Sequence, residues 1–379
     1  MFFKKELPLA FLAFCGTQCF AQTVPSLHLA AWQQSPDAQE SASKTASKPA
    51  SSSEVNETGW EFDIHFGYTI APHSTAGTGS LPDVSIPSST SADRLQPSYF
   101  FGGGAAQASV VSTGNGFAPI SPYDSALTTA QAQRKNDFSL GFRLGMDMNR
   151  WVGLEYQLEF GLTPLRLSNF AENQAAVTAS SIQTGLSPLM AQTGGVANAQ
   201  TFIGSQSGRQ IFNTLNANFY LRPAEAKWRP YFSVGGGVLN NTGEDPSLDL
   251  LGTYQVGGSA GLVESDQLKV RYEPTRIAPV AEYGIGLKHF LNQTIGLRFD
   301  LRDNIAWENV RTKIFAFPVP PTAGTSTFLF SGNGRSIAFS NDQGTLQSTL
   351  TQTVNGATTF NETGIKHHIA ASVGIVFRF

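Results

Sequence analysis

The feature that most constrains the fold is a two-residue alternation of apolar and polar side chains, which recurs along most of the chain. In residues 60–70, WEFDIHFGYTI, every second side chain is apolar and the residues between are mostly polar or glycine. Successive side chains of a strand point to opposite faces of a sheet, so this pattern predicts a strand with one apolar face. Residues 137–148 and 152–162 repeat the pattern across a short gap at Asn149 and Arg150, which predicts a long hairpin.

Five more strands are predicted on the same ground, at about 209–221, 229–239, 277–290, 295–307 and 365–379. Most of the eight are long enough to cross a membrane at a tilt, which needs about 9–11 residues. Long connections are predicted at about 71–136, 163–208, 240–276 and 308–364, and they alternate with short ones. An even number of strands with short turns at one end and long loops at the other predicts an all-β, closed, antiparallel transmembrane barrel.

A soluble β-sandwich is the alternative, because its strands alternate as well. Globular strands average only about 5–6 residues, shorter than these. The polar face also carries many glycines, which would weaken a sandwich strand without any gain in packing. Inside an eight-stranded barrel they would instead leave room for large side chains. The glycines in question are Gly67, Gly141, Gly145, Gly153, Gly161, Gly284, Gly286, Gly296 and Gly374.

The N-terminus has the pattern of a secretory signal peptide. Lys4 and Lys5 precede a short apolar run, and cleavage is expected after Ala21. This predicts a signal peptide at 1–21, a flexible Ser/Ala-rich periplasmic leader at 22–58 and a barrel domain at 59–379. A lipoprotein signal ending at Cys15 is the alternative, disfavoured by the bulky Phe14 just before it.

Composition excludes several functional classes. Both cysteines, Cys15 and Cys19, lie in the predicted signal peptide, which excludes a disulfide scaffold or a thiol enzyme. The net charge is −3 and only 14% of residues are charged, so we expect no nucleic-acid partner.

Charged residues on the polar face are expected to form a lumen charge network. One interpretation is a salt-bridged plug and the other is a gated pore, which would weakly prefer cations because acids outnumber bases. The plug is favoured, since so narrow a lumen leaves little room for water. The predicted network consists of Glu61, Asp63, Arg143, Asp147, Glu155, Glu159, Glu282, Lys288, Arg298, Asp300, Arg302 and Arg378.

Aromatic residues near the strand ends are expected at the two membrane interfaces. Trp151, Trp228 and Tyr231 fall at the short-turn end, whereas Tyr68 and Trp307 fall near the long loops.

The pattern resembles that of small eight-stranded outer-membrane β-barrels, similar to the OmpA transmembrane domain. The resemblance rests on WRPYFSVGGG, on GIGLKHF and IGLRFDLRD, and on the terminal VGIVFRF. It implies a location in the outer membrane of a Gram-negative cell, contact with outer-membrane lipid, and an assembly signal at Phe377 and Phe379 read by the barrel-assembly machinery. No peptidoglycan-binding domain follows the last strand, so we expect no cell-wall anchoring role.

Some barrels of this size act on lipid A, and His367, His368 and Ser372 are the candidates here, with His289 and His73 elsewhere. His367 and Ser372 lie on opposite faces of one strand and are not expected to meet, whereas catalysis needs a nucleophile and a base in contact. FGGG at 101–104 lacks the Lys-Ser/Thr of a phosphate loop, and we expect no helix after it. The chain is therefore predicted not to be an enzyme and to carry no metal or cofactor.

The remaining functional signal lies in the long loops, which are rich in Gly, Ser, Thr and Ala with scattered aromatics. STFLFSG and RSIAFSN, inside 325–341, are candidates for hairpins above the membrane. The leading prediction is a monomeric structural or surface-recognition protein that binds an unknown surface ligand through these loops. The alternatives are a narrow porin-like pore and, third, a lipid A-modifying enzyme at the membrane edge.

Overall fold

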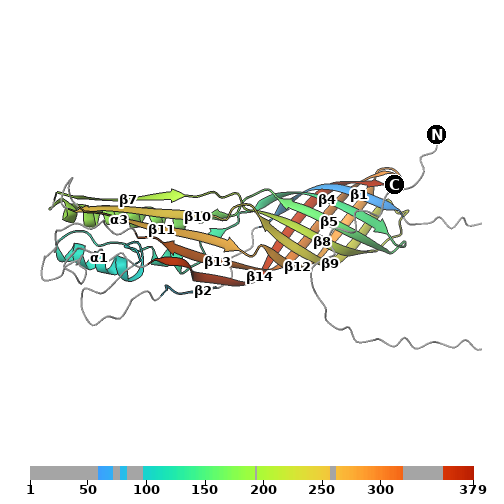
Figure 1. Ribbon diagram of the computed structural model, residues 1–379. Coiled ribbons are helices and arrows are strands. Elements are labelled where there is room, and N and C mark those ends of the chain that lie inside the picture. The colour runs from blue at the N-terminus through green and yellow to red at the C-terminus, as the bar shows by residue number, and fades with distance from the viewer. Residues whose placement is uncertain (1–58, 71–76, 83–96, 193, 257–261, 319–352) are drawn as a thin grey trace, which may run out of the picture. The chain divides into compact units, whose positions relative to one another are not determined.

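The computed structural model describes residues 59–70, 77–82, 97–192, 194–256, 262–318 and 353–379 (Figure 1). Its principal element is one antiparallel sheet of twelve strands. No helix in these ranges is long and apolar enough to cross a membrane. The predicted signal peptide, the leader, His73 and the 325–341 segment lie outside the described residues.

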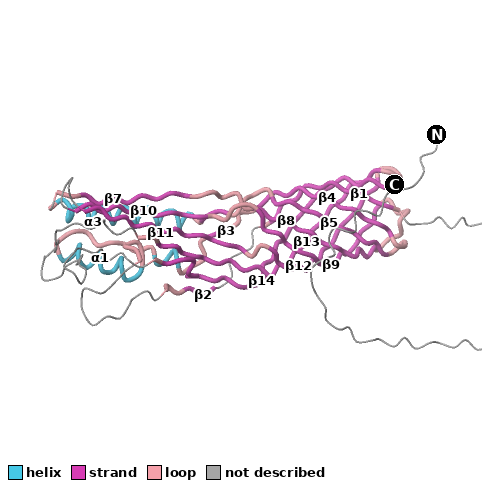
Figure 2. The backbone as a smooth tube through the Cα atoms, in the orientation of Figure 1, coloured by secondary structure: helices cyan, strands magenta, loops and turns pink. Residues whose placement is uncertain are grey.

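Eight strands of this sheet pair in a cycle (Figures 1 and 2). The order is β14, β1, β4, β5, β8, β9, β12, β13, and β13 pairs with β14 again, so each of the eight has a partner on both sides. We call this part the ring. Its strands are β1 (Trp60–Thr69), β4 (Asp137–Asp147), β5 (Val152–Gly161), β8 (Arg209–Tyr220), β9 (Trp228–Thr242), β12 (Ile277–Phe290), β13 (Ile295–Ala316) and β14 (Val354–Arg378).

The ring is closed by the pairing of its first strand, β1, with its last strand, β14. Ile64 lies opposite Ile375 in the β1–β14 register. The backbone N–H of Phe379 donates to the carbonyl of Trp60 at 2.9 Å, and that of Arg378 donates to Thr294 at 2.7 Å. These contacts lie at the end of the ring that also carries the short connections, which we call the short-turn end.

The prediction of eight strands in all is wrong, because the long connections contain strands of their own. β13 and β14 continue well past the residues predicted for them and pair with each other over almost their whole length. β11 adds to the extended part of β13, β10 adds to β11 and β7 adds to β10, while β2 pairs with β14. These strands are β2 (Gly77–Gly79), β7 (Val196–Ile203), β10 (Ser247–Val256) and β11 (Leu262–Pro274), and a separate pair is formed by β3 (Ala132–Gln133) and β6 (Arg166–Leu167).

Three helices also occupy segments predicted as loops. They are α1 (Gly102–Gly114), α2 (Asp124–Leu127) and α3 (Asn169–Ala191). α3 begins where the hydroxyl of Ser168 accepts a hydrogen bond from the backbone N–H of Ala171 at 3.1 Å, which is the usual N-cap arrangement. Figure 1 shows α3 lying along β7 and β10. α1 begins directly after Phe101, so the expectation of no helix there is also wrong.

A hydrophobic core joins these helices to the added strands. Ile182 and Leu186 of α3 are fully buried in it, together with Leu250 of β10 and Val270 of β11. Tyr99 and Tyr254 meet edge to face, with ring centroids 5.3 Å apart. The long connections therefore form a packed unit, which we call the outer domain.

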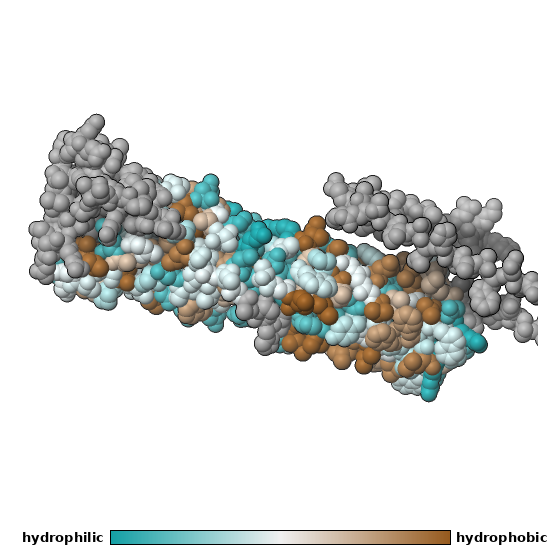
Figure 3. Space-filling view, turned by 90° about the horizontal axis from the view of Figure 1, so that it is seen from below, coloured by the Kyte–Doolittle hydropathy of each residue, from teal (hydrophilic) through white to brown (hydrophobic). Residues whose placement is uncertain are grey.

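The ring is apolar on its outer face and mostly polar on its inner face, which also holds a small apolar cluster of Phe212, Leu239, Ala278, Val280 and Ala306. Phe66 and Phe138 are each 64% exposed and Ile285 is 60% exposed, whereas Arg298 and Glu155 are 1% exposed. Figure 3 shows hydrophobic side chains gathered over one end of the described surface, with a more hydrophilic zone beside them. The interior is the charged side, the reverse of a soluble barrel.

Glycines on the inner face make room for large side chains. A Cβ on Gly141 would overlap the imidazole of His65, and one on Gly286 would overlap the ring of Tyr231. Glycine is needed at these two positions because a neighbouring side chain approaches the backbone closely, and not because the backbone is left-handed.

Candidate functional site

The inner face of the ring holds every residue of the predicted lumen charge network. All are buried except Arg378, which is partly exposed at the short-turn end. Their parity on the strands explains this, since the residues on either side of each point outward and are mostly apolar.

The centre of the interior is a cluster of arginines and carboxylates from different strands. Arg298 binds Glu155 through two nitrogens, at 2.5 and 3.1 Å. Arg302 also binds Glu155, at 2.8 Å, and forms an ion pair with Glu282. Paired forks of this kind are the strongest charge-assisted contacts that arginine makes.

A second set of contacts links this cluster to the opposite wall. Arg143 of β4 binds Asp300 of β13 at 2.7 Å. The same guanidinium donates to the side-chain oxygen of Gln157 at 2.9 Å. The hydroxyl of Tyr231 donates to Asp300 and accepts from Arg298 at 2.7 Å.

Tyr231 corrects one prediction. It was expected at the membrane interface, but it is 2% exposed and points into the interior. The neighbouring Trp228 and Phe232 hold the outward parity of β9, so Tyr231 shares its face with Arg229. Tyrosine suits either face, because its ring is apolar and its hydroxyl finds a partner when buried.

A third cluster closes the short-turn end. Lys288 forms an ion pair with Glu61, and Arg378 binds the other oxygen of Glu61 at 2.8 Å. Arg229, which the sequence analysis did not select, binds Asp147 at 2.6 Å and lies over the ring of Tyr220 at 3.3 Å.

Neutral polar residues complete the interior hydrogen bonding. They were missed because only charged residues were selected, although all of them share the polar parity. Asn216 and Thr214 donate to Glu282 at 3.0 and 2.9 Å, and Asn218 donates to Glu155 at 3.0 Å. Gln157 donates to Glu159 at 2.8 Å.

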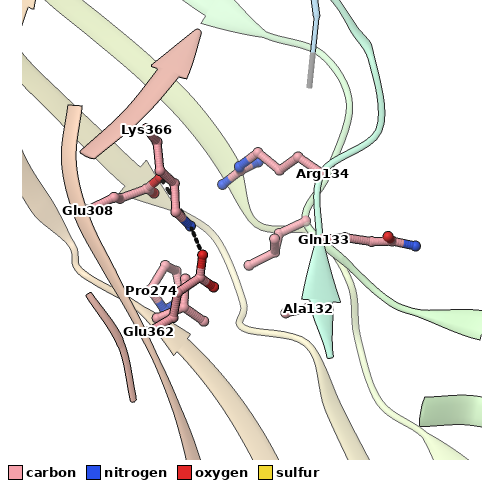
Figure 4. Close-up of a pocket in the computed structure, with 9 residues that line it drawn as sticks. Ala132, Gln133, Arg134, Pro274, Glu308, Glu362 and Lys366 are labelled. Atoms are coloured by element: carbon pink, nitrogen blue, oxygen red, sulfur yellow. Dashed lines mark ion pairs between the residues drawn. The ribbon is translucent and has the colours of Figure 1, made fainter. Parts of the chain in front are cut away.

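The other end of the interior contains a small cavity. It holds about 40 Å³, enough for a few water molecules. Glu308 accepts from Asn241 at 2.8 Å and from Gln210 at 3.2 Å, and Asn241 accepts from Arg134 at 2.9 Å. Figure 4 shows Arg134 entering from one side and Lys366 facing Glu362 on the other, with Lys366 and Glu362 3.4 Å apart. These side chains narrow the interior of the ring at the end that faces the outer domain.

The candidate catalytic residues do not form one site. His367 faces outward and its Nδ1 lies 2.7 Å from Asp303, which also accepts a hydrogen bond from Tyr283 at 2.9 Å. His368 faces inward, with Nε2 3.9 Å from Glu308. Ser372 is also inside, where its hydroxyl accepts from Arg143 at 3.2 Å.

His289 is separate from all of these, stacked on Trp228 with ring centroids 3.8 Å apart. Among the described residues, no three His, Cys, Asp or Glu side chains are grouped closely enough to hold a metal ion.

The outward aromatics mark both ends of the apolar band. Trp151 and Trp228 are exposed near the short-turn end, and Tyr68 and Trp307 are exposed towards the other end. Phe379 is 76% exposed and lies beside Trp60 at the join of the ring.

No family model matches the chain, and no curated protein does. Several solved structures resemble it distantly, among them three outer-membrane proteins. The outer membrane protease OmpT from Escherichia coli has a TM-score of 0.24 and 9% identity, over 86% of this chain and 98% of that one. An outer membrane channel from Pseudomonas putida F1 has a TM-score of 0.21 and 9% identity, over 85% and 96%. The toluene transporter TodX from P. putida has a TM-score of 0.17 and 10% identity, over 86% and 90%.

These likenesses assign no activity to the chain. They do correct the prediction that it is not an enzyme, since a protease is among the structures that resemble it. An OmpA-like identity receives no support from them.

Proposed function

We propose that the chain is an outer-membrane β-barrel protein that displays the outer domain on the cell surface for recognition. One observation carries the proposal: the ring has an exposed apolar outer face around a buried charged interior. A membrane replaces water at the outer face, whereas water would penalise so large an apolar surface. The cyclic strand pairing supports it, because unpaired backbone groups cost several kcal/mol each in hydrocarbon.

In this proposal the short-turn end faces the periplasm and the outer domain faces the medium. Short periplasmic turns and long outer connections are typical of outer-membrane barrels. A signal peptide at 1–21 would deliver the chain, and the barrel-assembly machinery would insert it as a monomer through Phe377 and Phe379. The pairing supports a monomer, because no ring strand needs a partner strand from another chain.

Insertion is tested on a gel run in mild detergent. A closed barrel should migrate differently before and after heating, because detergent alone does not unfold it. Protease added to intact cells should cleave the outer domain and leave the ring protected. A single mobility at all temperatures, or complete protection of α3 from added protease, would contradict the proposal.

We further propose that the interior is plugged rather than open. Support comes from the pairing of Arg298 and Arg302 with three buried carboxylates, those of Glu155, Asp300 and Glu282. In planar bilayers the protein should show no steady conductance. A stable conductance step in the wild-type protein would favour the pore.

The recognition role rests on the outer domain being packed and on its exposed apolar residues. Phe170 and Val177 of α3 are exposed and seven residues apart, so they share one face of the helix. Exposed apolar residues on a packed unit are typical of contact surfaces. The surface ligand is therefore proposed to contact this face of α3.

The test replaces both residues with aspartate and measures adhesion of expressing cells to an array of glycans and extracellular proteins. Asn169→Asp with Ala176→Asp is the matched control, because these exposed residues have the same spacing on the same helix but lie about 100° around it from Phe170 and Val177. Loss of adhesion in Phe170→Asp/Val177→Asp alone is expected. Equal adhesion of wild type and both variants to every array member would remove this role.

A further inference from the structure

Four basic residues gather on the outward surface where β11 pairs with the extension of β13. They are Lys269 and Arg271 of β11 and Arg311 and Lys313 of β13, which we call the basic patch. The inward-facing neighbours Val270, Tyr272 and Ile314 are buried in the core of the outer domain.

Only two of these cations have a carboxylate partner among the described residues. Lys313 lies 2.6 Å from Glu273, and Lys269 lies 3.9 Å from Asp249. Arg271 lies over the ring of Phe315, 5.2 Å from its centroid. Arg311 makes no ion pair within the described ranges, which leaves the patch with an excess of two positive charges.

The register places one unfavourable pair in the patch, whereas Arg311 lies opposite Glu273 without an ion pair to it. Arg271 lies directly opposite Lys313, and like charges in that relation destabilise a sheet. Arg311 is the diagonal neighbour of Arg271, about 7–8 Å away across the strands. Two guanidinium groups at this spacing present paired N–H donors to one phosphate group.

The height of the patch above the apolar band indicates which phosphate it meets. Trp307 lies on the outward face of β13 and marks the outer end of the band. Arg311 lies four residues further along the same face, roughly 13 Å at the usual rise of a strand. At the usual barrel tilt of about 35–45° this is roughly 10 Å of height. The headgroup layer extends about 5–7 Å beyond the hydrocarbon core, and the long Arg side chains reach down to it from there.

We propose that the basic patch binds the phosphorylated headgroup of an outer-leaflet lipid. The proposal rests on the membrane orientation given above. Arg271 and Arg311 hold the phosphate, and Lys269 and Lys313 add attraction that weakens with salt. Bound lipid would form a rim around this side of the protein, between the membrane and the outer domain.

Native mass spectrometry of the full-length protein in detergent tests the proposal, with lipid A carrying two phosphates as the probe. Arg271→Gln/Arg311→Gln should weaken binding roughly tenfold, as expected for the loss of charge-assisted contacts. Arg222→Gln/Lys227→Gln is the matched control, because it removes two exposed cations at the short-turn end and should leave binding unchanged. Arg311→Lys should bind with intermediate affinity, since it keeps the charge and loses the paired donors.

Two comparisons make the ligand assignment falsifiable. Dephosphorylated lipid A should bind the wild type no better than it binds the double variant. Inorganic tripolyphosphate that binds as tightly as lipid A would overturn the assignment to a lipid in favour of a soluble polyanion. Equal lipid A binding by wild type and double variant would show that the basic patch does not bind the lipid. Every variant is first checked for the heat-dependent mobility shift, so a failure of the barrel proposal is distinguished from a failure of this one.

Discussion

Glu155 of β5 and Arg298 of β13 meet inside the ring through two hydrogen bonds, at 2.5 and 3.1 Å. Arg302 approaches the same carboxylate at 2.8 Å, so one acid binds guanidinium groups from two positions of β13. The stability of the interior therefore depends strongly on this residue.

Replacing Glu155 with alanine should destabilise the ring by about 3–5 kcal/mol, because the buried arginines lose their shared partner. The temperature at which the folded band disappears on a mild-detergent gel should fall. Glu155→Gln/Arg298→Met should recover much of the loss, since it removes the uncompensated charge. Glu225→Gln, an exposed change in a short connection, is the control, and a Glu155→Ala transition as high as this control's would contradict the prediction.

The outer domain should unfold independently of the ring. Leu186→Ala in α3 removes a fully buried side chain and should cost about 2–5 kcal/mol. Hydrogen exchange should accelerate in α3, β7 and β10 while β1, β4 and β5 stay protected. Exchange that rises equally in both sets would show that the two parts unfold together.

Burial raises the pKa of Asp266 in the outer domain to about 7, although the Tyr99 N–H and the Ser98 hydroxyl both donate to it. In the unfolded chain this pKa is about 3.9. The folded state thus holds the proton more tightly, so stability is greatest at low pH and falls as the pH rises from about 4 to 7.

Exchange protection of β11 should therefore be higher at pH 5 than at pH 8, after correction for intrinsic exchange rates. Asp266→Asn should reduce this difference, because its amide does not ionise. Glu244→Gln is a suitable control, since it changes an exposed carboxylate in the connection between β9 and β10. An unchanged pH dependence in Asp266→Asn would refute the assignment.

Phe379 lies at the join between the ends of the ring. Phe379→Asp should reduce the amount of folded protein recovered from outer membranes several-fold, because a charge replaces an exposed aromatic beside Trp60. Phe170→Asp makes the same change on α3 and should leave assembly intact. Full assembly of Phe379→Asp would remove the predicted assembly signal.

The strands of the ring were predictable because one physical rule governs them. In β1 and β4 an outward apolar residue alternates with an interior residue that is polar or glycine, so a period of two appears without interruption. Tyr231 was misplaced because tyrosine satisfies either side. The partners inside the ring were beyond prediction, because pairing of Arg143 with Asp300 depends on strand positions far apart in the sequence.

The outer domain was missed although its sequence carried signals. In α3 the cap at Ser168 and the buried Ala175, Ile182 and Leu189 follow helical spacing, which its Ser, Ala and Gln content obscured. In β11 the inward face includes Asp266, so the alternation appeared broken there. Burial of a carboxylate depends on partners such as Ser98, which no local pattern reveals.

The unbroken run of β13 and β14 from the short-turn end into the outer domain has a mechanical consequence. Their ladder pairs Ile295 with Phe377 at one end and Ala316 with Val354 at the other, roughly 70 Å along the strands. A ligand that pulls on the outer domain would load this ladder in shear, so many hydrogen bonds would share the force at once. In the proposed membrane orientation, the outer domain would then resist such a pull with little stretching, and the force would pass directly to the membrane-embedded ring.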